Sequence, residues 1–132
     1  MKRVLDTNIC IYIIKKRPIE VLKRFKEFDV GDLALTSITV AELTYGAYKS
    51  QHQQKNLKAL EDFFYPFDFL DFDEMAAREY GMIRASLESS GQVIGGLDML
   101  IAAIVKAHGY ILVTNNVKEF ERVEGLKIEN WT

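Results

Sequence analysis

The sequence predicts an α/β domain of three layers, in which helices cover both faces of a central parallel sheet. Short apolar runs typical of buried strands recur along the chain, and segments with apolar residues three and four positions apart lie between them. This alternation is typical of βαβ units. With 132 residues, of which 48% are apolar and 27% charged, the chain is long enough for one sizeable core. We therefore expect residues 1–132 to form a single domain.

The first half of the chain contains two predicted strands and three predicted helices. Residues 3–5 and 33–36 are apolar runs that suit strands buried on both faces. Helices are expected over 8–15, which ends near Pro18, and over 19–28. After the second strand, Ser37 or Thr39 is expected to cap a helix that continues to about residue 49.

The second half repeats the alternation. An amphipathic helix is expected over 51–64 and a long helix over 73–89, with a short strand over 67–70 between them. Residues 97–107 are apolar almost all round, which predicts a buried helix. The remaining expected elements are a strand over 111–114, a turn or short helix over 117–122, and a last strand over 127–129.

The composition excludes several classes of protein. There is no apolar stretch of membrane-spanning length, and charged residues interrupt the N-terminus too early for a signal peptide. Cys10 is the single cysteine, which suits a reducing compartment, and we expect a cytoplasmic protein with Cys10 in the core. One cysteine with His52 and His108, well separated, cannot supply a usual structural zinc site.

Four acidic residues stand beside a predicted strand end or helix start: Asp6, Glu42, Asp98 and Glu119. In an open α/β fold such positions converge on one edge of the sheet, where ligands bind. Carboxylates gathered there repel one another unless protons or a cation neutralise them, and hard oxygen ligands favour Mg²⁺ or Mn²⁺. The sequence therefore predicts a Mg²⁺ site in which Mn²⁺ can substitute.

Polar residues crowd the same predicted edge and are expected to hold water or to orient the carboxylates: Thr7, Asn8, Thr114 and Asn116. Two Mg²⁺ ions in such a site would support attack of water on a phosphodiester, with a metal-bound hydroxide as the nucleophile. The sequence has no P-loop, no dinucleotide-binding glycine motif and no G-x-S-x-G nucleophile elbow.

Each acid also has an ordinary explanation. Asp6 suits an Asx turn or a helix N-cap, and Glu42 with Thr39 fits a capping box. Asp98 suits the positive end of a helix dipole, and Glu119 suits an exposed surface position. Together the four favour a site, because a carboxylate after a buried central strand is costly unless it is paired or bound to a metal.

The net charge of −2 argues at first against a nucleic-acid partner. Without the four candidate acids, however, 15 acids remain against 17 bases, and bound cations would attract phosphate. A basic run contains Lys15, Lys16, Arg17, Lys23, Arg24 and Lys26. Both a solvated helix face and an RNA-facing rim explain this run, and the sequence leaves the two open.

Five segments together resemble the PIN-domain ribonucleases, and more narrowly the toxins of the VapC type. The segments are residues 4–8 (VLDTN), 37–43 (SITVAEL), 94–103 (IGGLDMLIAA), 112–120 (LVTNNVKEF) and 125–131 (GLKIENW). The resemblance extends over nearly the whole chain, with the segments in family order.

The resemblance implies a PIN-like fold and a Mg²⁺- or Mn²⁺-dependent endoribonuclease. Asp6, Glu42 and Asp98 match the three most characteristic acids, with Asp6 and Asp98 as principal metal ligands. Many relatives carry an aspartate at the fourth position, which is assigned here to Glu119, with Asn116 as a polar helper.

The resemblance also implies a type II toxin–antitoxin system. The expected partners are a second copy of the chain, a cognate antitoxin whose C-terminal segment blocks the cleft, and DNA only through that antitoxin. The expected substrate is structured RNA, with tRNA and in particular initiator tRNA preferred. Tyr45 and Tyr48 would receive the antitoxin segment, stack on RNA bases, or simply pack between helices.

Two other functions remain open. One is a Mg²⁺-binding receiver module of signalling proteins, although Asp6 is followed by Thr7 and Asn8 rather than by a second acid. The other is a catalytically silent PIN scaffold that binds RNA or an antitoxin. The intact acids argue against the second.

Overall fold

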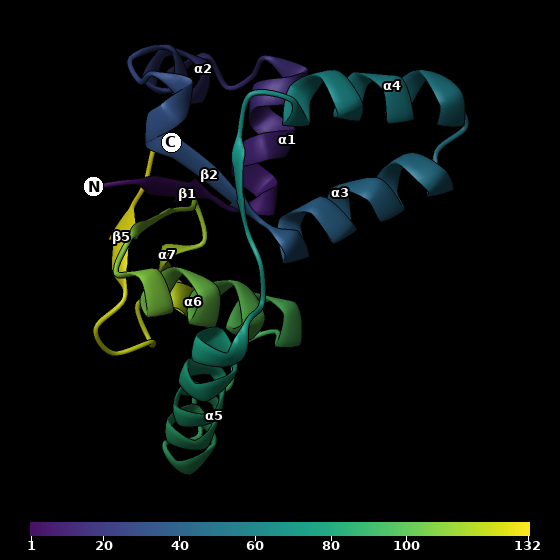
Figure 1. The fold of residues 1–132 in the computed structure, drawn as a ribbon. Helices are drawn as coiled ribbons and strands as arrows, with labels where there is room; N and C mark the ends of the chain where they lie inside the picture. Colours follow the sequence, from purple (N-terminus) through teal and green to yellow (C-terminus); the bar gives the residue numbers. More distant parts are fainter.

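A five-stranded parallel sheet forms the centre of the molecule (Figure 1), in a computed structural model that describes residues 1–132 apart from the side chain of Val30. All four strand pairs are parallel and the strand order is β3-β2-β1-β4-β5. The strands are β1 (Arg3–Leu5), β2 (Leu33–Thr36), β3 (Asp68–Leu70), β4 (Ile111–Val113) and β5 (Lys127–Glu129). The predicted three-layer α/β/α fold is confirmed.

Helices connect the strands and cover both faces of the sheet. They are α1 (Thr7–Lys15), α2 (Ile19–Lys26), α3 (Ser37–Lys49), α4 (Gln53–Phe64), α5 (Glu74–Ser89), α6 (Gly96–His108) and α7 (Val117–Phe120), with a 3₁₀ turn η1 (Val30–Asp32). The predicted elements are all present, and their ends differ from the expected ones by no more than two residues. No helix in the described part of the chain is long and apolar enough to cross a membrane.

The start of α3 differs from the prediction. Neither Ser37 nor Thr39 is the cap, because the strand β2 passes into the helix without a loop and Thr36 is the last extended residue, with φ −84° and ψ 155°. The Thr36 hydroxyl accepts a hydrogen bond of 3.1 Å from the Thr39 backbone N–H. Glu42 is therefore in the second turn of α3, and the capping-box explanation for Glu42 is wrong.

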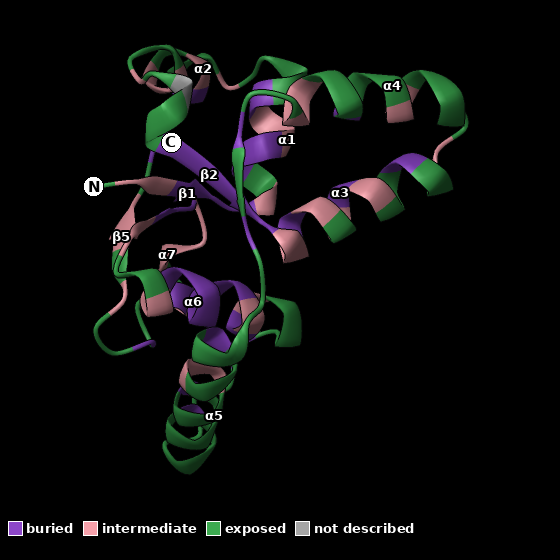
Figure 2. Cartoon of the chain, viewed as in Figure 1, coloured by how far each residue is buried: buried purple, intermediate pink, exposed green. Residues whose placement is uncertain are grey.

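The core consists of two clusters, one on each face of the sheet. Successive strand residues point to opposite faces, so that Val4 belongs to the cluster with α5 and α6, whereas Leu5 packs on the side of α1, α3 and α4. Helix α6 is buried along most of its length (Figure 2), as its continuous apolar sequence predicts. The buried part of α6 extends from Met99 to Val105 and belongs to the cluster that includes Val4.

The strand order also tests one of the alternatives that the sequence left open, the receiver module of signalling proteins. Receiver modules have a doubly wound sheet in which the order of strands is 2-1-3-4-5. Here β1 lies between β2 and β4, and β3 is at the edge beside β2. The receiver alternative is therefore excluded by topology.

A cluster of charged and aromatic side chains holds the C-terminal segment against the rest of the chain. The Glu129 carboxylate accepts hydrogen bonds from Arg3 (3.0 Å), Arg24 (2.9 Å) and the Trp131 indole (2.8 Å). The Trp131 ring stacks on Phe28, with centroids 5.4 Å apart. This C-terminal cluster ties β5 to β1 and to α2.

Candidate active site

The predicted site residues come together at the carboxyl edge of β1, β2 and β4. A pocket of about 110 Å³ lies there, lined by Asp6, Thr7, Asn8, Glu42, Asp98, Asn116 and Phe120. Six of these seven are residues that the sequence singled out; Phe120 is the exception. The other two predicted residues, Thr114 and Glu119, each accept a hydrogen bond from Asn116, which lines the pocket.

Asp6 is 5% exposed and begins α1 as its N-cap. One carboxylate oxygen, Oδ1, accepts a hydrogen bond of 2.9 Å from the Ile9 backbone N–H, so the capping explanation is correct for this oxygen. Burial raises the pKa of Asp6 to about 6, and the charge of Glu42 adds to the rise, against opposing hydrogen bonds from Thr114, Ile9 and Asn8. Capping alone does not relieve the cost of this buried carboxylate.

Asp98 lies in the first turn of α6 and meets Glu119 of α7. Burial first, and after it the neighbouring carboxyl group of Glu119 and the charges of Glu42 and Asp6, raise the pKa of Asp98 to about 6. The Glu119 Oε2 atom also accepts a hydrogen bond of 3.0 Å from the Asn116 side-chain amide. Glu119 is thus half-buried at the site rather than free on the surface.

Glu42 reaches the pocket from α3 and is held by Thr7. The Thr7 hydroxyl donates to Glu42 Oε1 over 2.7 Å, and the Thr7 and Thr39 hydroxyl oxygens are 3.2 Å apart. Three helices and the junction between β1 and α1 therefore contribute to one carboxylate cluster, in which each acid lies within the electrostatic influence of another.

The residues at the pocket fit a hydrated divalent cation. In the described part of the chain, no three His, Cys, Asp or Glu side chains are gathered closely enough to form a complete metal cage. Mg²⁺ and Mn²⁺ do not need one, because they bind oxygen ligands and Mg²⁺ usually keeps several waters. Burial first, and the neighbouring acids after it, raise the pKa of Asp6 and Asp98, and a bound cation would stabilise both carboxylates in the ionised form.

Sequence reasoning missed the site's buried threonines on the β2–α3 side. Among the described residues, the buried polar or charged ones are Asp6, Thr36, Thr39 and Thr114. All four lie at this edge of the sheet. Thr36 is the last residue of the apolar strand β2, and Thr39 comes three residues later. This spacing could have indicated two polar side chains that face the site.

An apolar groove of about 550 Å³ opens beside the pocket, between α1, α3 and α4. Thr7 and Glu42 line both the pocket and the groove, and Lys15, Ser50 and Asn56 also line the groove. Tyr45 and Tyr48 of α3 are 66% and 58% exposed, so helix packing within the chain does not cover them.

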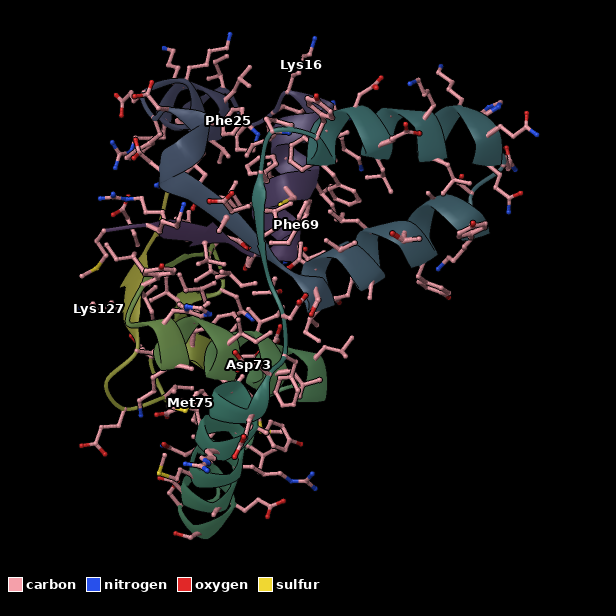
Figure 3. All side chains as sticks on the ribbon, viewed as in Figure 1. Lys16, Phe25, Phe69, Asp73, Met75 and Lys127 are labelled. Atoms are coloured by element: carbon pink, nitrogen blue, oxygen red, sulfur yellow. The ribbon has the colours of Figure 1, made fainter. Side chains whose placement is uncertain are left out.

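The basic run lies away from the carboxylate pocket. Lys16 directly follows α1, which is nine residues long. In Figure 3, Lys16 projects from the end of α1 that is far from the start of α3. Arg24 pairs with Glu27 and Glu129, whereas Lys23 and Lys26 are exposed on α2. The solvated-face explanation suits α2, while Lys15 alone of the run lines the groove.

Comparisons with known proteins agree with this architecture. The family model described as "PIN domain" matches residues 3–126. "Ribonuclease VapC2" of Haemophilus influenzae is 47% identical over 131 residues, which are 99% of this chain and 98% of that protein. "tRNA(fMet)-specific endonuclease VapC" of Shigella flexneri is 46% identical over 132 residues, covering 100% and 99% of the two chains.

Solved structures show the same fold. A chain of VapBC2 from Rickettsia felis, bound to a DNA fragment from the promoter, superposes with a TM-score of 0.91 at 38% identity, and both chains are covered completely. A chain of DNA-bound VapBC from Salmonella typhimurium gives 0.93 at 41% identity, covering 100% of this chain and 99% of that one.

Proposed function

The chain belongs to the VapC ribonucleases of the PIN-domain family, and we propose that it is an endoribonuclease that cleaves initiator tRNA as the toxin of a toxin–antitoxin pair. The observation that carries the proposal is the convergence of Asp6, Glu42 and Asp98 on one pocket, with Glu119 hydrogen-bonded to the pocket residue Asn116. The choice of tRNA is supported by the 46% identical relative that is named for tRNA(fMet) cleavage.

The four acids would hold the divalent cations of a phosphodiester hydrolase. Asp6 and Asp98 are the principal ligands, Glu42 is a further ligand, and Glu119 completes the site with the Asn116 amide beside it. When bound, two such ions supply an activated water and stabilise the leaving oxygen. The protein keeps the ligands in place: Thr7 donates to Glu42, and the Ile9 backbone N–H donates to Asp6.

The antitoxin would occupy the groove between α1, α3 and α4. The groove lining is mainly apolar, with Leu43, Ala47 and Leu60, and Glu42 lies where the groove meets the pocket. An amphipathic helix with a basic side chain at one end matches this pattern, because its apolar face fits the groove and its charge meets Glu42. DNA would be bound through the antitoxin; the Rickettsia felis and Salmonella typhimurium structures described above are VapBC complexes with DNA bound.

A homodimer is the expected assembly of the toxin. Large apolar side chains on the β3–α5 connection and on α5 and α6 stay exposed in one copy, among them Phe72 (37%), Met75 (58%) and Leu97 (50%). A second copy would cover such residues. Analytical ultracentrifugation of the toxin without antitoxin tests this expectation.

The function is tested by cleavage of initiator tRNA and of total tRNA, with Mg²⁺ or with EDTA, and by sequencing of the fragment ends. Discrete fragments with 5′-phosphates, formed only with metal, are expected. If the folded, antitoxin-free protein leaves initiator tRNA intact but cuts another RNA, the substrate is wrong. If it cuts no RNA, the silent scaffold becomes the better explanation.

A further inference from the structure

Three threonine hydroxyls form a line that ends on Glu42. The Thr36 and Thr39 oxygens are 3.4 Å apart, those of Thr39 and Thr7 are 3.2 Å apart, and Thr7 reaches Glu42 Oε1 over 2.7 Å. Thr36 and Thr39 are completely buried. The line crosses from the end of β2 through α3 to the first residue of α1, and so joins three elements that form the site.

The direction of these hydrogen bonds follows from counting protons. A hydroxyl has a single proton to donate, and the shortest contact, to the carboxylate of Glu42, takes the proton of Thr7. Thr39 must therefore be the donor to Thr7, and Thr36 the donor to Thr39. All three protons point toward Glu42, an arrangement in which each bond polarises and strengthens the next.

Burial makes Thr39 the important member of the line. Its hydroxyl is closed to solvent, so no water can take its place if it is removed. Thr7, which is only half-buried, would then keep its bond to Glu42 without a second anchor and could turn to another rotamer. Among the described side chains, Thr7 is the hydrogen-bond donor to the Glu42 carboxylate.

We propose that Thr39 is a positioning residue, which fixes Thr7 and through it the Glu42 carboxylate for the divalent cations of the site. The inference rests on the proposed function, because it assigns Glu42 to the cations. Thr39 does not line the pocket and acts through Thr7. The hydroxyl, rather than the shape of the side chain, is the part that matters.

Thr39→Val tests the proposal, since valine keeps the shape and removes the hydroxyl. We expect Mn²⁺ affinity, measured by calorimetry without RNA, and kcat each to fall about tenfold. The KM for tRNA should stay within about twofold, because substrate contacts are unchanged. Thr39→Ser should restore both values. Thr44→Val, the same change on the half-buried side of α3, should match wild type.

The proposal is wrong if Thr39→Val binds Mn²⁺ as tightly as the wild type. It is also wrong if Thr39→Ser does not restore the Mn²⁺ affinity, or if Thr44→Val loses as much Mn²⁺ affinity as Thr39→Val. If Thr39→Val does not fold, Thr7→Val breaks the next link and must give the same loss. If the wild-type protein binds Mn²⁺ but cleaves no RNA, the proposed function fails, whereas the Mn²⁺ affinities of the variants still decide the role of Thr39.

Discussion

Asp98 at the start of α6 lies beside Glu119 of α7, and this second acid helps to raise the pKa of Asp98. Two neighbouring carboxyl groups repel each other when both are ionised, so a proton on one of them is favoured when no cation is bound. A divalent cation can replace that proton, because it neutralises both groups at once. This pair is therefore the place where metal and proton compete most directly.

Asp98→Asn should remove cleavage and leave the fold intact. The change deletes a proposed metal ligand, and we expect kcat to fall below about one hundredth of wild type, since even residues behind the ligands cost 10–100-fold. In EDTA the variant should unfold at an equal or higher temperature, because repulsion is relieved. Glu121→Gln, an exposed acid beyond α7, is the control and should stay active.

Without metal, the protein should become less stable as pH rises from about 4.5 to 6. Burial first, and the neighbouring acids after it, raise the pKa of Asp6 and Asp98 from 3.8 to about 6. In this range the folded state binds more protons than the unfolded state, so ionisation favours unfolding. Urea denaturation in EDTA across this range checks the sign. The slope should be smaller in Asp98→Asn, and a stability that rises with pH in wild type would contradict the prediction.

Mn²⁺ should raise the melting temperature of the wild-type protein by mass action on the folded state. At one hundred times the dissociation constant, the gain is about 2.7 kcal/mol. Differential scanning fluorimetry with increasing Mn²⁺ measures it. Asp98→Asn should gain much less at the same concentrations, and an equal gain would place the bound ion elsewhere.

Gly46→Leu should weaken antitoxin binding. Gly46 lines the groove on α3, and a Cβ atom there would meet no atom within 4 Å, so the leucine would extend into space that the antitoxin needs. The helix itself should gain stability of up to about 1 kcal/mol, because glycine is a poor helix former. Gly81→Leu on α5, also without neighbours within 4 Å, is the control and should bind the antitoxin normally in a pull-down titration.

Glu129→Gln should destabilise the C-terminal cluster. The carboxylate is partly buried, and hydrogen bonds from Arg3 and Trp131, with the charges of Arg3 and Arg24, outweigh the effect of burial and hold the pKa of Glu129 below its ordinary value. Loss of the charge leaves Arg3 without its ion pair and Arg24 with Glu27 alone, at a cost of about 1–2 kcal/mol after allowance for solvent screening. Urea denaturation at pH 7 measures the cost. Glu124→Gln, which is exposed, should change it little.

The sequence was sufficient for the order of elements and for most of the pocket, because strands, helices and parallel pairing follow from local patterns. Asp6 could be placed since it directly follows a buried strand. The proximity of Asp98 and Glu119 could not be predicted, because it depends on where α7 lies relative to α6. The role of Thr36 as cap was missed because the chain has no loop between β2 and α3.

The central position of β1 in the sheet has a consequence for synthesis of the chain. Asp6 emerges from the ribosome early, yet β1, the strand that it follows, pairs on one side with β4, which is made much later. The carboxylates at positions 6, 42, 98 and 119 cannot meet until nearly the whole sheet has formed, and such distant pairings are slow to form. A nascent chain therefore carries no assembled nuclease, and the cell that makes this protein is exposed to it only after folding.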